Sequence, residues 1–153
     1  MTDIENSRYA QKAKALFEEG YNCAQSVFIA FEDIHKIDRT SAAKLSSSFG
    51  AGLGRMREVC GCVSGMALAA GMICGYSDPN AKEEKAEHYK LIQSLANEFK
   101  QANGSYICRE LLSGINNSTD PTPEARTAEY YKKRPCPMLC AIAAAILEDK
   151  LKL

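Results

Sequence analysis

The chain has 153 residues, of which 46% are hydrophobic and 25% are charged, a composition typical of one globular domain with its own core. Nineteen basic and nineteen acidic residues leave no net charge, which argues against nucleic acid or an anionic membrane as a partner. The N-terminus lacks the basic start and apolar run of a secretory signal, and no stretch is apolar for the length of a membrane span. We therefore expect a single cytoplasmic domain over residues 1–153.

The N-terminal part of the chain predicts two helices. Residues 3–19 carry apolar side chains at helical spacing, and Gly20 follows where a C-terminal cap would fall. Asn22 can cap a second helix, which extends to residue 34. Cys23 lies in its first turn on the apolar face, so its thiol should point inward.

A glycine-rich turn follows. A short helix over 41–48 should end at the turn 49–55, because glycine favours non-helical backbone. Residues 59–73 include many small side chains and few β-branched ones, a composition that predicts a helix. Gly65 and Ala69 share one face of it and would let another backbone approach closely.

The C-terminal half predicts four more helices. A long helix over about 81–102 has an apolar stripe that includes Ala86, Tyr89, Leu95 and Phe99. Three further helices are expected, over 105–112, over about 123–134 and from Pro137 onward, with Cys136 at or near the N-cap of the last. The fold class is therefore all-α, a compact bundle of about five to seven helices with cysteines gathered at helix N-termini.

Seven cysteines, at positions 23, 60, 62, 74, 108, 136 and 140, are the most informative residues. An odd number in a reducing cytoplasm argues against a structural disulfide framework and favours metal or redox chemistry. A cysteine at a helix start faces the positive end of the backbone dipole, which lowers its pKa. Four cysteines fit that description: Cys23, Cys60, Cys108 and Cys136. Positive charge that could offset their thiolates is supplied nearby by Arg55, Arg57, Arg109 and Arg134.

Other patterns are weaker. The Cys60-Gly61-Cys62 and Cys136 to Cys140 spacings are not those of thioredoxin-like motifs or most zinc knuckles. His35 and His88 are expected on solvated helix faces, and so is the charged run 130–134. The glycine turn has neither the preceding strand nor the Gly-Lys-Ser/Thr of a phosphate loop.

Several blocks of the sequence occur in the order found in a known family. They are Gly20–Val27, Phe49–Arg55, Cys60–Gly65, Cys108–Leu112 and Cys136. Over residues 20–140 the chain resembles the redox-active proteins named for their C-GCAxxG-C-C cysteine pattern. The resemblance implies a small helical prokaryotic protein whose pattern cysteines carry a redox function, related to a domain of split-Soret cytochromes for which an iron–sulfur centre is suggested. No CxxCH motif for covalent haem is present.

The resemblance assigns the redox role to Cys23, Cys60, Cys108 and Cys136. The chain departs from the family in having Cys62 where alanine is usual and in adding Cys74 and Cys140. The leading hypothesis is that the four pattern cysteines converge on a metal centre, a 2Fe–2S cluster used for electron transfer. Its potential would be tuned by Arg55 and by the backbone at Gly52, Gly54 and Gly61.

Two alternatives stay open. In a metal-free thiol–disulfide oxidoreductase or redox sensor, a low-pKa thiolate such as Cys60 or Cys136 would attack and another cysteine would resolve. In a structural domain that docks partners, four thiolates would hold zinc. The expected partner is a redox protein or a small thiol or electron donor, and the close-packing glycines are compatible with a homodimer.

Overall fold

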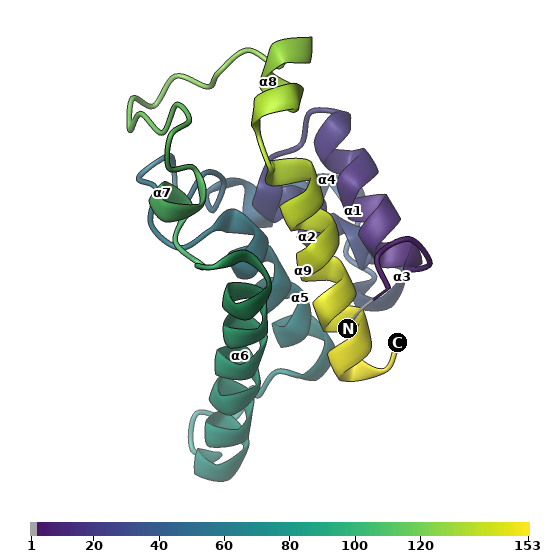
Figure 1. Ribbon diagram of the computed structural model, residues 1–153. Helices are drawn as coiled ribbons and strands as arrows, with labels where there is room; N and C mark the ends of the chain where they lie inside the picture. The colour runs from purple at the N-terminus through teal and green to yellow at the C-terminus, as the bar shows by residue number, and fades with distance from the viewer. Residues whose placement is uncertain (1–2) are drawn as a thin grey trace.

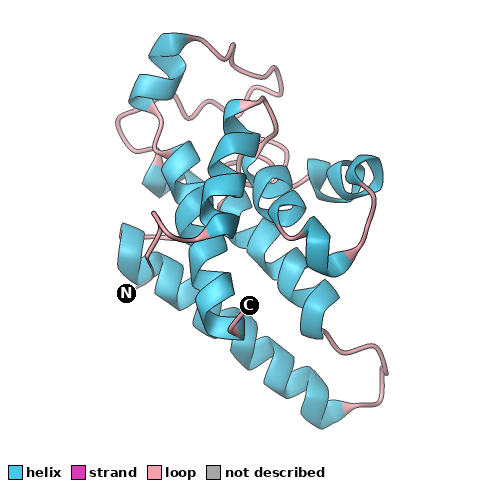
Figure 2. Cartoon of the chain, turned by 90° about the vertical axis from the view of Figure 1, so that its right-hand side faces the viewer, coloured by secondary structure: helices cyan, strands magenta, loops and turns pink. Residues whose placement is uncertain are grey.

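The protein folds as a bundle of helices, and the computed structural model describes residues 3–153 (Figure 1). The described residues form nine helices and no strand (Figure 2). In chain order they are α1 (Arg8–Glu18), α2 (Cys23–Ala30), α3 (Glu32–His35), α4 (Arg39–Ser47), α5 (Gly61–Cys74), α6 (Lys82–Asn103), α7 (Cys108–Leu111), α8 (Ala128–Lys133) and α9 (Cys136–Leu151). The predicted all-α class is confirmed. Within the described part, no helix combines the length and apolar character needed to cross a bilayer.

The core forms around α9, which lies in the middle of the bundle in Figure 1. This helix contacts α1, α2, α5 and α6, and its buried face is rich in alanine, including Ala143 and Ala144. Small side chains let the surrounding helices pack close to the α9 backbone. The side chains that fill the space between helices are large, among them Phe28, Phe31 and Phe99, which are fully buried. Each such burial contributes about 2 kcal/mol to the stability of the fold.

Helices α2 and α5 cross closely at Gly65. A Cβ atom there would lie 2.6 Å from the carbonyl oxygen of Ala24, closer than packed atoms allow, so only glycine fits. The predicted close approach at this face of α5 is therefore confirmed. It brings the N-terminal ends of α2 and α5 together.

The helix predicted over 22–34 is in fact interrupted. Helix α2 ends at Ala30, and Phe31 leaves helical geometry with φ −99° and ψ 19° before α3 begins. The turn folds His35 back over Phe28, where its ring stacks at 4.4 Å between centroids and Nε2 lies 2.9 Å from the Phe28 carbonyl oxygen. His35 is thus buried, and its predicted solvated position is wrong.

Two predictions for the second half also need correction. The first turns of α6 extend beyond the rest of the bundle (Figure 1), so Ala86 and Tyr89 are exposed while Leu95 and Phe99 are buried. The helix expected from residue 123 begins only at Ala128, because the side chain of Thr127 accepts a hydrogen bond from the Tyr130 amide and caps it there. The loop before α8 is therefore longer than predicted.

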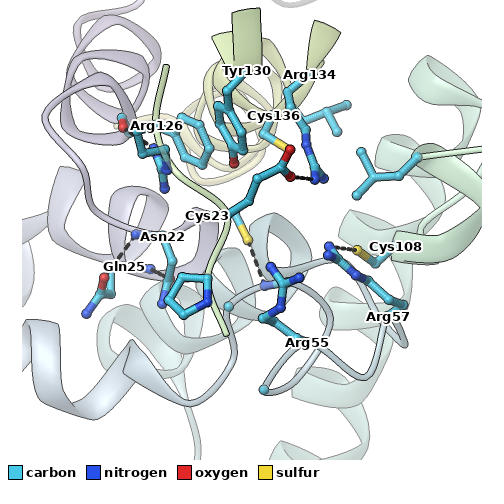
Figure 3. Close-up of a pocket in the computed structure, with 18 of the residues that line it drawn as sticks. Asn22, Cys23, Gln25, Arg55, Arg57, Cys108, Arg126, Tyr130, Arg134 and Cys136 are labelled. Atoms are coloured by element: carbon cyan, nitrogen blue, oxygen red, sulfur yellow. Dashed lines mark hydrogen bonds and ion pairs between the residues drawn. The ribbon is translucent and has the colours of Figure 1, made fainter. Parts of the chain in front are cut away.

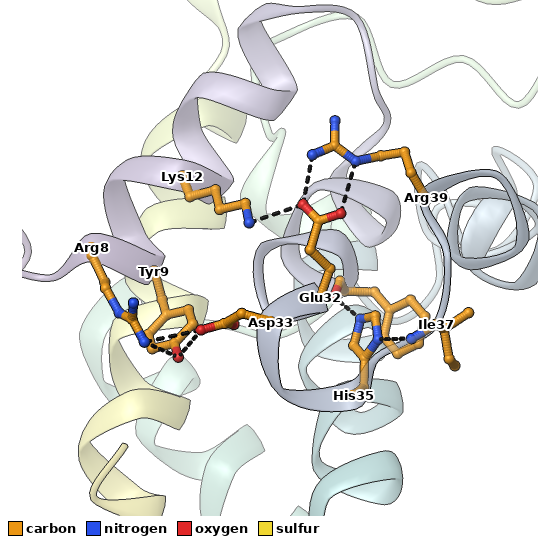
Figure 4. Close-up of polar contacts among 9 residues, drawn as sticks. Arg8, Tyr9, Lys12, Glu32, Asp33, His35, Ile37 and Arg39 are labelled. Atoms are coloured by element: carbon orange, nitrogen blue, oxygen red, sulfur yellow. Dashed lines mark hydrogen bonds and ion pairs between the residues drawn. The ribbon is translucent and has the colours of Figure 1, made fainter.

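An ion-pair cluster joins α1 to α3 and α4 (Figure 4). The carboxylate of Glu32 accepts from Arg39 Nε at 3.1 Å and pairs with Lys12 Nζ at 2.9 Å. The hydrogen bonds from Arg39, with smaller contributions from Lys12, lower the pKa of Glu32 to about 2. Since this folded-state pKa lies below the unfolded value, the carboxylate stabilises the fold above about pH 4 and loses that effect as the pH falls toward 2.

We expect Glu32→Gln to lower the free energy of unfolding by about 1 kcal/mol near pH 7 and by much less near pH 2. Urea unfolding at both pH values measures this. The control is Glu129→Gln, whose carboxylate pairs with Lys133 on an exposed surface and should change stability little. An equal loss for Glu32→Gln at both pH values would contradict the ion-pair role.

Candidate functional site

A cavity of about 650 Å³ lies where the N-terminal ends of α2, α7 and α9 meet the glycine-rich turn (Figure 3). Cys23, Cys108 and Cys136 line it. Cys60, the fourth predicted ligand, is buried at 5% exposure and does not line it. Each of the four stands at a helix start: Cys60 is the N-cap of α5, and the other three are the first residues of their helices.

Cys23 is positioned by the cap of α2. Asn22 accepts a hydrogen bond from the Gln25 amide, and the Gln25 side chain accepts from the Asn22 amide, a reciprocal arrangement that fixes the helix start. The Asn22 side chain also donates to the Ser47 carbonyl at 3.0 Å. This ties α2 to the chain just before the glycine-rich turn. The Ala51 amide of that turn then donates to Cys23 Sγ at 3.4 Å.

The turn itself has an unusual backbone. Residues 51–55 all have positive φ, between 53° and 74°, and each non-glycine residue in that region carries a strain of about 1–2 kcal/mol. Gly52 is required for space as well, because a Cβ there would lie 2.6 Å from the Glu58 amide nitrogen. Strain of this kind persists where the surrounding structure fixes it, often at functional sites. Gly54 lines the cavity, whereas Gly52 does not.

A short antiparallel pairing brings Cys60 and Cys108 together. Val59 and Ile107 form a β-bridge, in which the Cys60 amide donates to the Tyr106 carbonyl at 2.8 Å and the Cys108 amide to the Glu58 carbonyl at 2.7 Å. Neighbouring residues in extended chains point to opposite faces. Both cysteines therefore lie on the face opposite Val59, which is exposed while they are buried.

Gly61 lies where the start of α5 approaches α2 closely. A Cβ atom at this position would overlap Cys23 Sγ and would lie 2.8 Å from the Phe49 carbonyl oxygen. The absence of a side chain lets the Cys23 sulfur lie against the start of α5, beside Cys60. Gly61 was predicted as a cofactor-binding residue; it does not line the cavity and acts on the site by leaving space for sulfur.

The segment before α9 closes the cavity. The Arg126 guanidinium stacks on the Phe17 ring at 4.0 Å and donates to the Phe17 and Tyr21 carbonyls at 2.8 and 3.0 Å. Arg134 is buried, pairs with Glu124 and donates to the Asn116 carbonyl. The predicted solvated face over 130–134 is thus wrong for Arg134, because the loop before α8 folds over it. These contacts hold Cys136 at the cavity wall.

Arg57 places its guanidinium within hydrogen-bonding distance of a thiol. It is 3% exposed, its Nε donates to the Ser118 carbonyl at 3.0 Å and its Nη1 lies 3.8 Å from Cys108 Sγ. Its buried Nη2 has no hydrogen-bond partner among residues 3–153. Arg109, which is adjacent to Cys108 in sequence, instead forms an exposed ion pair with Glu58 and does not line the cavity.

The thiols influence one another's ionisation. A hydrogen bond from Cys62, together with the Ala51 amide, lowers the pKa of Cys23 to about 6 despite burial. Burial raises the pKa of Cys108 and Cys136, and the charges of neighbouring cysteines, including Cys23 and Cys60, raise both further. The lowered pKa predicted for a cysteine at a helix start therefore holds for Cys23 and is wrong for Cys108 and Cys136, because burial outweighs the helix dipole there.

Two of the three remaining cysteines form a separate pair. Cys62 and Cys140 are both fully buried, and their Sγ atoms lie 3.5 Å apart. Cys74 is exposed at the far end of α5, where its thiol donates to the Ala70 carbonyl. Among residues 3–153 no disulfide is formed, and no three metal-ligating side chains stand close enough to hold one ion.

Fold and site together define a helical protein with thiols collected at helix starts around one basic cavity. Residues 21–150 match the model of the family described as "Putative redox-active protein (C_GCAxxG_C_C)". The chain belongs to this family, whose description gives it a redox function. Neither the curated proteins nor the solved structures compared with the chain gave a match.

Proposed function

We propose that Cys23, Cys60, Cys108 and Cys136 hold an iron–sulfur cluster, of the 2Fe–2S type, and that the protein transfers electrons. The observation that carries this proposal is that all four thiols stand at helix starts, three of them lining one basic cavity and the fourth, Cys60, buried at the start of α5. A dithiol mechanism would use only two of these four thiols, whereas ligation of a cluster by four cysteines uses all four. When bound, the cluster would supply one-electron chemistry.

The charges around the thiols support an anionic centre. Four thiolates bring four negative charges into a region that burial makes unfavourable for them. The Arg57 guanidinium beside Cys108 Sγ and the Ala51 amide on Cys23 Sγ offset part of this charge. Such contacts to ligating sulfurs also set the potential of a cluster. Arg55, whose side chain lines the same cavity, adds to the positive potential.

We favour a cluster over a single zinc ion because the thiols of the described residues are not grouped for one ion. A structural zinc ion needs all four sulfurs at about 2.3 Å from one point, and no three ligating side chains among the described residues are grouped for one ion. A cluster divides its four thiolates among several irons, so its ligands stand farther apart. The zinc alternative is therefore the less favoured of the two metal centres.

We place this function in the cytoplasm, with a redox partner. Reduced thiols in this number fit a reducing cytoplasm. The electrons would come from, or pass to, a redox partner protein or a small electron donor. The homodimer predicted from the sequence is part of this proposal.

Anaerobic purification followed by assays of iron and acid-labile sulfide, with a visible absorption spectrum, tests the proposal. We expect coloured protein with iron and sulfide in equal amounts. Protein that stays colourless and free of iron after reconstitution with iron and sulfide would overturn it. Stoichiometric zinc in protein from cells grown in iron-rich medium would favour the alternative of a structural zinc-binding domain.

Thiol–disulfide exchange is a second candidate, favoured by the 3.5 Å separation of Cys62 and Cys140. A small disulfide could oxidise the pair: the two thiols lose two electrons and two protons and form one S–S bond, and the reagent is reduced to two thiols. Cys23 lies next to this pair, because the Cys140 thiol donates to the Cys23 carbonyl oxygen at 3.8 Å.

Mass mapping of the metal-free protein after equilibration with oxidised and reduced glutathione tests the exchange function. A Cys62–Cys140 disulfide that forms and breaks reversibly with the glutathione ratio is the expected result. Cys74 provides an internal control, because it is exposed and distant from the pair and should form only mixed disulfides. Irreversible oxidation, or no bridge at any ratio, would eliminate this candidate.

A further inference from the structure

The cavity beside the cysteines is larger than a metal centre requires. Its volume of about 650 Å³ corresponds to roughly 20 water molecules and falls in the range of small-molecule sites. Away from the thiols its wall is largely apolar, with side chains that include Leu111, Leu112, Leu139 and Tyr130. There is room for an organic molecule next to the thiol centre.

The charges that line the cavity are unbalanced. Four arginines line it, and Glu124 is the one acidic side chain among the described lining residues. Glu124 is already paired with Arg134. Arg126 donates to main-chain carbonyls and so stays a net positive charge. Even with Cys23 ionised, four arginines face two negative charges, so the metal-free cavity carries an excess of positive charge that an anion would neutralise.

Arg57 and Arg55 offer open donors to such an anion. Arg57 is 3% exposed and lines the cavity, yet its Nη2 lacks a hydrogen-bond partner within residues 3–153. A buried N–H donor without an acceptor destabilises the fold by about 1–3 kcal/mol, and by more when the group is charged. Arg55 uses its Nε on the Asp120 carbonyl at 2.6 Å, and Figure 3 shows both arginines on the same side of the cavity.

We propose that the cavity binds a small organic anion, with its carboxylate at Arg57 and Arg55 and its apolar part against Leu112 and Leu139. Guanidinium groups match carboxylates in geometry and bind them with two parallel hydrogen bonds. The apolar walls favour a carboxylate with a hydrocarbon body over an inorganic anion. Any chemical role for this ligand rests on the proposed function, whereas its binding is a property of the cavity.

Binding is tested on the full chain, both as purified and after metal removal, with benzoate and 3-phenylpropionate as probes. Their neutral amides serve as matched controls of the same shape. Titration calorimetry and ligand-observed NMR should show that the carboxylates bind and that the amides bind about tenfold more weakly or not at all. Arg57→Met and Arg55→Met should each weaken carboxylate binding by about tenfold.

Arg109→Met is the control variant, because Arg109 lies outside the cavity in an exposed ion pair; it should leave binding unchanged. Circular dichroism shows whether each variant folds. If Arg57→Met does not fold, Arg55→Met alone still tests the proposal. The proposal is overturned if neither carboxylate binds up to about 10 mM, if acid and amide bind equally, or if Arg109→Met weakens binding as much as Arg55→Met. Iron content is measured separately. If the protein binds the carboxylates but cannot be loaded with iron and sulfide, the cluster proposal is refuted and the anion-binding proposal stands.

Discussion

The Gly61→Ala variant is expected to lose both stability and iron. The added Cβ would overlap Cys23 Sγ and crowd the Phe49 carbonyl, so either the sulfur moves or the starts of α2 and α5 separate. Overpacking at such a site destabilises a fold by about 3 kcal/mol. Displacing a ligand by even part of an ångström should lower iron per chain by about tenfold. Thermal unfolding and an iron assay on the same preparation measure the two effects.

Gly71→Ala is the matched control for Gly61→Ala. Gly71 belongs to the same helix, and a Cβ there would meet nothing within 4 Å. The substitution should stabilise the protein by about 0.5–1 kcal/mol, because alanine is a better helix former, and iron content should not change. Wild-type iron content in Gly61→Ala would show that the contact between Cys23 and the start of α5 is not needed for the metal centre.

Replacing cysteines one at a time is expected to divide them into two groups. Serine at position 23, 60, 108 or 136 removes one of four proposed ligands and should lower iron per chain by about tenfold or more. The same preparations should lose the visible absorption of the cluster. Circular dichroism shows whether each variant still folds, which separates a lost ligand from a lost structure.

The remaining cysteines provide the controls. Cys74→Ser should keep its iron because this thiol is exposed and far from the cavity. Cys62→Ala and Cys140→Ala should keep theirs too, with a loss of stability of about 1–2 kcal/mol from the small spaces left in the core. Iron loss in Cys62→Ala equal to that in Cys60→Ser would place Cys62 among the ligands.

The helices and their cysteine-bearing starts were predictable because their signals are local. The Asn22 cap, the glycines before α5 and Pro137 at the start of α9 act within a few residues. Each therefore predicts a helix start without knowledge of the rest of the fold. The break between α2 and α3 was missed because Phe31 leaves helical geometry through packing, with its side chain fully buried.

The long-range features of the site could not be predicted from local patterns. The pairing of Val59 with Ile107 joins segments almost fifty residues apart, and neither segment forms a regular strand. That pairing places Arg57 next to the Cys108 segment, where its Nη1 lies 3.8 Å from Cys108 Sγ. Arg57 and Arg134 were predicted as positive charge near the cysteines but not as buried side chains, and no local pattern indicated Arg126.

Anomalous diffraction at the iron edge, from crystals of anaerobically purified protein, tests the central claim most directly. The account predicts an iron peak among the Sγ atoms of Cys23, Cys60, Cys108 and Cys136, with the Cys62 and Cys140 sulfurs outside bonding distance. A fully occupied crystal with no iron peak at these four sulfurs, or with two of them joined in a disulfide, would contradict it.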